Sequence, residues 1–176
     1  MIASFIIMFG CVGFGYRYIF VQKMRLKQMK ELERMILYIC DEIKVNHRVL
    51  SESFKIISQK CSQPFDGWLL ELACDIESKN VNKNVNKNES SFIDIWDDKI
   101  KELCKLTYLY MSDMEELNNI GHAFGKDVTA CLNNISVEKE HLHLKTNELE
   151  EDIKTKNKVG MALSTTVGIL LIIVLW

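Results

Sequence analysis

The sequence predicts an all-α protein, an antiparallel helical bundle of about six helices in which the first and last helices extend into transmembrane helices. Three observations lead to this prediction. Two uncharged apolar segments, residues 1–16 and 159–176, enclose a highly charged middle. The 176 residues include one proline and eight glycines, so few positions interrupt a helix. Apolar residues also recur every three or four positions along most of the middle, which is the spacing of an amphipathic helix.

The two apolar segments are long enough to cross a bilayer as helices. The first continues to Val21 with only Arg17 interrupting it, and about 20 helical residues cross a hydrocarbon core of ~30 Å. We therefore predict a transmembrane helix at 1–22, a helical-bundle domain at 23–158 and a second transmembrane helix at 159–176. A signal peptide at the front and a buried core helix at the back are the alternatives. The front has no basic region before its apolar run and no A-x-A-like cleavage site after it.

Cations on the inner side of both apolar segments predict the orientation. The basic residues that flank the segments are Arg17, Lys23, Arg25, Lys27, Lys30, Lys154, Lys156 and Lys158. The positive-inside rule then places the central domain in the cytoplasm, with both termini outside the cell membrane. A peripheral protein that binds anionic lipid through the same lysines is the alternative.

The first helix is predicted to continue beyond the membrane as an amphipathic helix to about Val45. A second, short helix follows, with Ser51 as its expected N-cap, and a third begins near Pro64, which suits a first helical turn. Residues 79–91 repeat an Asn-Val-Asn-Lys unit with little apolar surface to bury. We expect a mobile surface loop there.

Capping residues predict where the next helices begin and end. Ser91 is expected to cap a fourth helix, and Ser112 with Glu115 has the spacing of a capping box for a fifth helix that runs to about Phe124. Gly125 is placed to end that helix, and Asp127 to cap the sixth. The fourth helix is predicted to contain Ile95, Trp96, Ile100, Leu103 and Leu106.

The sixth helix is predicted to be the longest, because no glycine or proline occurs between Lys126 and Val159. Its apolar positions follow a four-three rhythm that two polar residues, Lys139 and Thr146, weaken. We therefore expect it to pack against the first helix rather than to form a dimeric coiled coil. Its acidic residues are expected to lie on a solvated face: Glu138, Glu148, Glu150, Glu151 and Asp152.

Small residues in the apolar segments have the spacing of packed membrane helices. Gly160, Ser164 and Gly168 recur every four residues, and Cys11 with Gly15 offers a shorter version of the pattern. These residues are expected to let the two spans approach each other, or other membrane proteins.

Charge and chemistry exclude several classes of function. A net charge of −2 gives no reason to expect nucleic acid as a partner. The chain has no phosphate-binding glycine loop, no zinc-protease motif and no nucleophile elbow, so we expect no enzyme, no small-molecule substrate, no cofactor and no metal. The six cysteines are scattered and are expected to act as small core residues. His47 and His122 are expected to lie on the surface, and His141 and His143 are spaced so that they do not easily share a metal.

The order of elements and several strings over nearly the full chain resemble a known family, the stage III sporulation protein AB of endospore-forming bacteria, most specifically in one segment. The string from Glu116 to Asp127 resembles the family's repeated Leu-Gly motif and its following aspartate, with Ile120 and Phe124 in place of the leucines. Gly121, Gly125 and Asp127 match, and Trp96 falls where the family commonly has an Ala-Trp pair. The charged helix that runs into Gly160 also resembles the family's C-terminus.

The resemblance implies a non-enzymatic membrane scaffold of the secretion-like channel, or feeding tube, that the mother cell builds around the forespore. The family's soluble domain is similar to the cytoplasmic domain of platform protein F of type II secretion, which implies that it couples a hexameric secretion-type ATPase, the AA partner, to membrane ring subunits. The implied residue roles are structural: Gly121 for close helix approach, Gly125 and Asp127 for a turn, and Trp96 for the core. A two-span membrane signalling adaptor is the alternative function.

Overall fold

The computed structural model describes the backbone of residues 2–46, 49–82, 92–124 and 128–175. Side chains are described for 16–44, 49–78, 92–124 and 133–157, and for residues 13, 159, 160 and 166. Within these residues the protein is all-helical, as predicted. The elements are α1 (Ile2–Asn46), α2 (Leu50–Ser58), α3 (Phe65–Asn82), α4 (Phe92–Leu106), the 3-10 helix η1 (Met111–Asp113), α5 (Glu115–Ala123) and α6 (Val128–Leu175).

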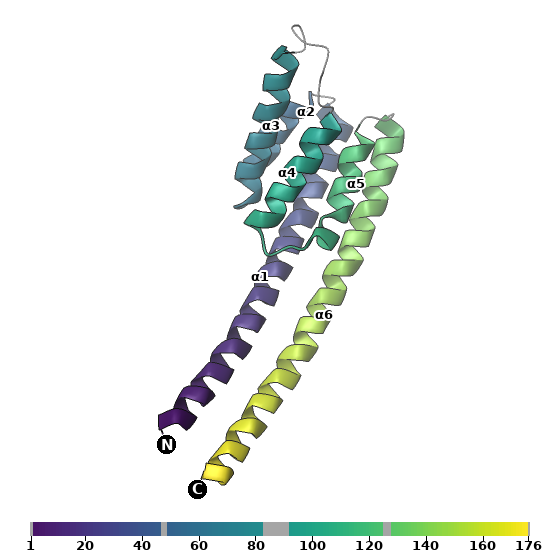
Figure 1. The fold of residues 1–176 in the computed structure, drawn as a ribbon. Helices are drawn as coiled ribbons and strands as arrows, with labels where there is room; N and C mark the ends of the chain where they lie inside the picture. The colour runs from purple at the N-terminus through teal and green to yellow at the C-terminus, as the bar shows by residue number, and fades with distance from the viewer. Residues whose placement is uncertain (1, 47–48, 83–91, 125–127, 176) are drawn as a thin grey trace.

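Two long helices and a cluster of shorter ones make up the fold (Figure 1). Helices α1 and α6 lie side by side, and both extend well beyond the cluster toward the same end, where the two termini lie. Helices α2 to α5 pack at the other end, and consecutive helices run in opposite directions. Each helix packs on its neighbours in the chain, and the contact between α1 and α6 closes the bundle.

Apolar periodicity explains why α1 and α6 pair. Met29, Leu32, Met35, Ile36 and Ile39 are buried at alternating three- and four-residue steps that keep them on one side of α1. The buried residues of α6 with the predicted rhythm are Ile135, Leu142, Thr146 and Ile153. Polar pairs flank this seam, from Lys30 Nζ to Glu150 Oε2 at 2.5 Å and from Glu33 Oε1 to His143 Nδ1 at 2.6 Å. The predicted packing of the last helix on the first is thus confirmed.

Three of the predicted boundaries were wrong. Helix α2 begins at Leu50 after an extended Val49, so Ser51 lies inside the helix and does not cap it. The predicted capping box of Ser112 and Glu115 does not form, because Ser112 is part of η1 and Met114 precedes α5 without a side-chain cap. Helix α3 continues through Asn82, so residues 79–82 of the expected loop are helical, while 83–91 lie outside the described residues.

One predicted burial was wrong, and one apolar residue of the fourth helix is exposed. Leu106 lies in α4 as expected and is 57% exposed, because the buried face of the helix ends with Leu103. Cys74 is exposed on α3, whereas Cys40 is buried and Cys61 and Cys104 are half-buried as expected of small core residues. Cys11, Cys131 and the expected cap Ser91 lie outside the residues whose side chains are described.

No helix contains a segment long and apolar enough to cross a membrane within the described part of the chain. Most side chains of the predicted spans at 1–22 and 159–176 lie outside that part, so both spans stay predictions.

Candidate functional site

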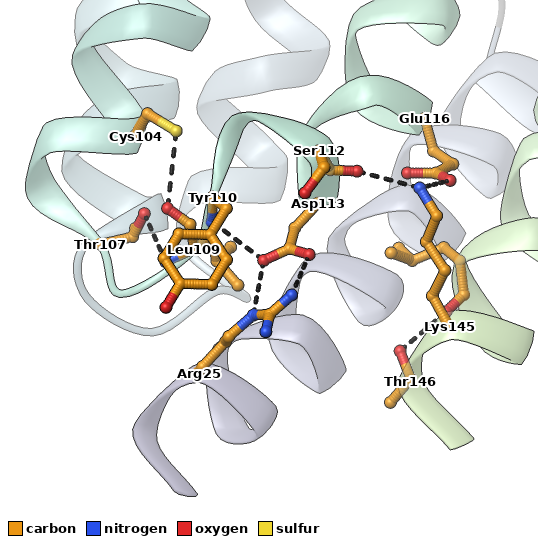
Figure 2. A network of polar contacts seen from close by, with 11 residues as sticks. Arg25, Cys104, Thr107, Leu109, Tyr110, Ser112, Asp113, Glu116, Lys145 and Thr146 are labelled. Carbon is orange, nitrogen blue, oxygen red and sulfur yellow. Dashed lines mark hydrogen bonds and ion pairs between the residues drawn. The ribbon is translucent and has the colours of Figure 1, made fainter. Parts of the chain in front are cut away.

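The candidate site is the junction at which the helical cluster meets the paired long helices. An ion pair between Arg25 of α1 and Asp113 of η1 forms its centre (Figure 2). The guanidinium donates from Nε to Oδ2 at 2.8 Å and from Nη2 to Oδ1 at 2.6 Å. Asp113 is 3% exposed. The hydrogen bond to Asp113 holds the pKa of Arg25 above its usual value. A two-point contact of this kind fixes both direction and distance between the two elements.

The segment between α4 and η1 is held against α1 by further contacts. The backbone N–H of Tyr110 donates to Asp113 Oδ2 at 2.9 Å, and the Arg25 guanidinium lies 4.4 Å from the centre of the Tyr110 ring. The backbone N–H of Tyr108 donates to Oε1 of the buried Gln28 side chain at 2.7 Å. One turn of α1, from Arg25 to Gln28, therefore positions this connecting segment.

Helix α6 joins the same junction through Lys145. Its ammonium group lies 2.6 Å from Oε1 of the buried Glu116 and donates to the carbonyl oxygen of Ser112 at 2.9 Å (Figure 2). Glu116 is the second residue of α5, where a carboxylate also benefits from the positive end of the helix dipole. One lysine on α6 thus contacts both η1 and α5.

An open cleft of about 390 Å³ lies between these elements. Met29 and Leu149 contribute apolar surface, and Glu148 and Asp152 of α6 contribute exposed carboxylates. The cations that line the cleft, Arg25 and Lys145, already pair with Asp113 and Glu116. The junction therefore acts as a clamp between η1, α5 and the two long helices.

Trp96 and Gly121 form a second close contact, between α4 and α5. Trp96 is fully buried, and an added Cβ at Gly121 would lie 2.0 Å from its Nε1 atom. The indole contacts a cluster of aromatic rings at centroid distances of 5.6 to 6.0 Å, formed by Phe54, Trp68, Phe92 and Phe124. Only glycine allows this approach, because any side chain would overlap the indole.

The remaining predicted residues are described less fully. Gly125 and Asp127 lie outside the described residues. An added Cβ at Gly160 would meet no atom within 4 Å. The side chains of Ser164 and Cys11 are not among those described, nor are the surroundings of Gly168 and Gly15. The helix-packing role of these small residues stays a prediction.

No group of three or more histidine, cysteine, aspartate or glutamate side chains could hold a metal ion in the described part of the chain. The described histidines, His122, His141 and His143, are exposed, and His122 pairs with Asp97 at 3.0 Å. Burial raises the pKa of the half-buried Cys61 thiol to about 11, which disfavours the thiolate.

Sequence reasoning missed the central ion pair. It treated Arg25 only as a member of a basic flank and assigned no role to Asp113, which lies 88 residues away. Lys145 and Glu116 were missed for the same reason, since each stands among many other charged residues. The pairing partner of a charged residue has no local signature in the sequence.

Comparisons with known proteins agree with the resemblance seen in the sequence. A family model described as stage III sporulation protein AB matches residues 1–176. A solved structure titled "Stage III sporulation protein AB (SpoIIIAB)" is similar with a TM-score of 0.64 and 18% identity, over 74% of this chain and 97% of that chain. A comparison with curated proteins found no match. At this identity the structural likeness shows the fold, whereas the family model covers the whole sequence; the chain therefore belongs to the stage III sporulation protein AB family.

Proposed function

We propose that this chain is a non-enzymatic membrane scaffold of the sporulation assembly that the mother cell builds around the forespore. In this role its bundle contacts a cytoplasmic, hexameric secretion-type ATPase, and its apolar helices contact the membrane ring subunits. The family membership supports a role in sporulation. The geometry of the long helices supports the proposed coupling of the ATPase to the membrane.

The observation that carries the proposal is the continuity of α1 and α6. Helix α1 (Ile2–Asn46) runs without interruption from the first apolar segment into the bundle. Helix α6 (Val128–Leu175) runs without interruption from the bundle into the second apolar segment. The buried seam and the pairs of Lys30 with Glu150 and of Glu33 with His143 join them into one rod. A rigid rod transmits a displacement of the bundle to the apolar ends, as a scaffold between two machines requires.

The clamp at the junction supports the same function. Arg25 binds η1 to α1, and Lys145 binds η1 and α5 to α6. Because the contacts reach both long helices, the bundle cannot rotate about one of them without breaking buried charge pairs. Removing one partner of a fully buried pair costs about 3–5 kcal/mol, and these pairs, whose cations are 18% and 36% exposed, cost no more than that. The clamp therefore resists motion between the bundle and the rod.

The expected orientation in the membrane depends on the basic residues that flank the two apolar segments. Lys30, Lys154 and Lys156 form ion pairs with acidic residues of α6, which reduces the net charge of the flanks. The positive-inside rule depends on the number of lysines and arginines and not on net charge, so the expected orientation is unchanged. The proposal places the bundle in the cytoplasm of the mother cell and both termini on the other side of its membrane.

The test interrupts the rod without changing either end. Four Gly/Ser residues are inserted after Gln22 in α1 and after Asn157 in α6, and the variant replaces the native gene in the sporulating host. The matched control carries the same insertion within 83–91. We expect the ATPase to copurify with the interrupted chain, and the strain that carries it to form no heat-resistant spores. With the control chain, both copurification and spore formation should be retained.

Two outcomes contradict the proposal. Normal spore yield with both helices interrupted would show that a rigid connection is unnecessary. Absence of the ATPase from material purified with the wild-type chain would instead favour the two-span signalling adaptor.

A further inference from the structure

A short surface segment carries a concentration of exposed apolar side chains that the scaffold function does not use. We name residues 106–111, from the last residue of α4 to the first residue of η1, the tyrosine loop. Leu106, Tyr108, Tyr110 and Met111 are 57%, 42%, 53% and 56% exposed, respectively. Only Leu109 among its large side chains is buried. Other exposed large apolar residues of the bundle, such as Val49 and Leu70, stand singly.

The tyrosine loop has a fixed place in the fold. It crosses the side of the bundle that faces the two termini (Figure 1). Gln28 accepts the N–H of Tyr108, and Arg25 contacts the Tyr110 ring. Since the carbonyl of Leu109 also accepts the Cys104 thiol at 3.5 Å, the loop is held from the side of α4 as well. Its exposed rings are therefore displayed on a rigid base.

Helix geometry gives the distance from this loop to the predicted membrane. Arg25 follows the end of the predicted span at residue 22 by three residues, or about 4.5 Å of helix, and follows Arg17 by about 12 Å. On α6, Asp152 lines the same cleft as Arg25 and precedes Val159 by about 10 Å. The headgroup region extends about 5–8 Å beyond each face of the hydrocarbon core, so extended tyrosine and methionine side chains at this level reach it.

The composition of the loop and its surroundings suits a lipid surface. Tyrosine concentrates at the membrane–water interface, where its ring is shielded and its hydroxyl remains hydrated. The neighbouring last turns of α4 carry Lys101 and Lys105, and the facing part of α1 carries Lys23 and Lys27, all exposed. A lysine near an anionic membrane surface contributes about 1 kcal/mol of attraction.

We propose that the tyrosine loop lies in the headgroup layer of the same bilayer that holds the two spans. This inference rests on the membrane anchoring in the proposed function. With two helices and one loop in contact with the membrane, the bundle has three supports that are not in line, and its tilt relative to the bilayer is fixed. A fixed tilt would hold the far end of the bundle, near Val49, at a constant height above the membrane.

The experiment measures the depth of single tryptophans in the full-length chain. The Trp176→Phe chain retains Trp68 and Trp96, which are buried and give a constant background. Tyr108→Trp or Met111→Trp is added to it, and the chain is placed in nanodiscs of phosphatidylcholine and phosphatidylglycerol with or without a headgroup spin label. Val49→Trp is the matched control, because Val49 is exposed and lies between the end of α1 and the start of α2, away from the two termini.

We expect the spin label to quench the emission of the tryptophans at 108 and 111 and to leave that at 49 unchanged. A separate comparison of the wild-type chain with Trp176→Phe reports whether Trp176 is quenched, which tests the predicted span itself. Quenching of Trp176 without quenching at 108 and 111 would overturn the loop proposal and leave membrane anchoring intact. Absence of quenching at all these positions would overturn both.

Discussion

Replacing Gly121 by alanine tests the contact between α4 and α5 most sharply. The new Cβ would lie 2.0 Å from Trp96 Nε1, 2.2 Å from Cε2 and 2.3 Å from Cδ1, well inside van der Waals contact. The indole cannot move aside easily, because four other aromatic rings surround it within 6.0 Å. The substitution therefore forces either the indole or the helix backbone to shift.

The expected loss of stability follows from two opposing effects. Overpacking of a dense core costs about 1–3 kcal/mol, and the rigidity of the aromatic cluster favours the upper end. Alanine in a helix is about 1 kcal/mol more favourable than glycine. The net loss is then about 2 kcal/mol, which for a chain of this size lowers Tm by about 4–8 °C.

Thermal unfolding followed by near-ultraviolet circular dichroism measures this loss, because the buried Trp68 and Trp96 dominate the signal. Gly67→Ala is the control, since an added Cβ at Gly67 meets no atom within 4 Å. The further change Trp96→Phe should recover part of the stability of Gly121→Ala, because the smaller ring leaves room for the methyl group. A Gly121→Ala chain with the same Tm as the wild type would refute the close contact.

Three further predictions concern the charged residues and the cysteines. Arg25→Ala should cost about 3 kcal/mol by leaving the buried Asp113 unpaired, and Asp113→Asn should recover part of that loss in denaturant titrations; equal stability of the single and double variants would contradict this. Hydrogen bonds from Lys30 and Lys154 lower the pKa of Glu150 from 4.5 to about 2, so its contribution to stability is present above pH 4.5 and disappears as pH falls toward 2. Glu150→Gln should remove this part of the pH dependence and leave the rest. Iodoacetamide should label the exposed Cys74 before Cys61, whose pKa burial raises to about 11; mass spectrometry showing the reverse order would contradict the burial of Cys61.

Periodic apolar positions allowed the long helices and their pairing to be predicted. The three- and four-residue spacing of apolar residues from Met29 to Ile39, and the similar spacing around Leu142, each indicate one buried helix face. Two long helices with such faces can bury them by packing against each other. The individual importance of Trp96 and Gly121 was also expected. Their direct contact was not, because residues 25 positions apart give no local signal of touching.

Capping and charge pairing were predicted poorly for a physical reason. The expected capping box at Ser112 and Glu115 competes with Asp113, which accepts the N–H of Tyr110 and binds Arg25. That distant arginine stabilises the 3-10 turn in place of the local box. Ser51 is the second residue of a helix that begins at Leu50, and Val49, at the N-cap position, makes no side-chain capping hydrogen bond. Local rules fail where a partner from another element supplies a stronger contact.

The proposed connection of the ATPase to the membrane ring subunits by this chain can be measured by copurification through a tagged ring subunit. The ring subunit is isolated from detergent extracts of sporulating cells with the gene for this chain present, deleted or restored. We expect the ATPase to copurify with the ring subunit when this chain is present, to be lost on deletion of its gene and to return on restoration. An ATPase that remains bound to the ring subunit in the deletion strain would contradict it.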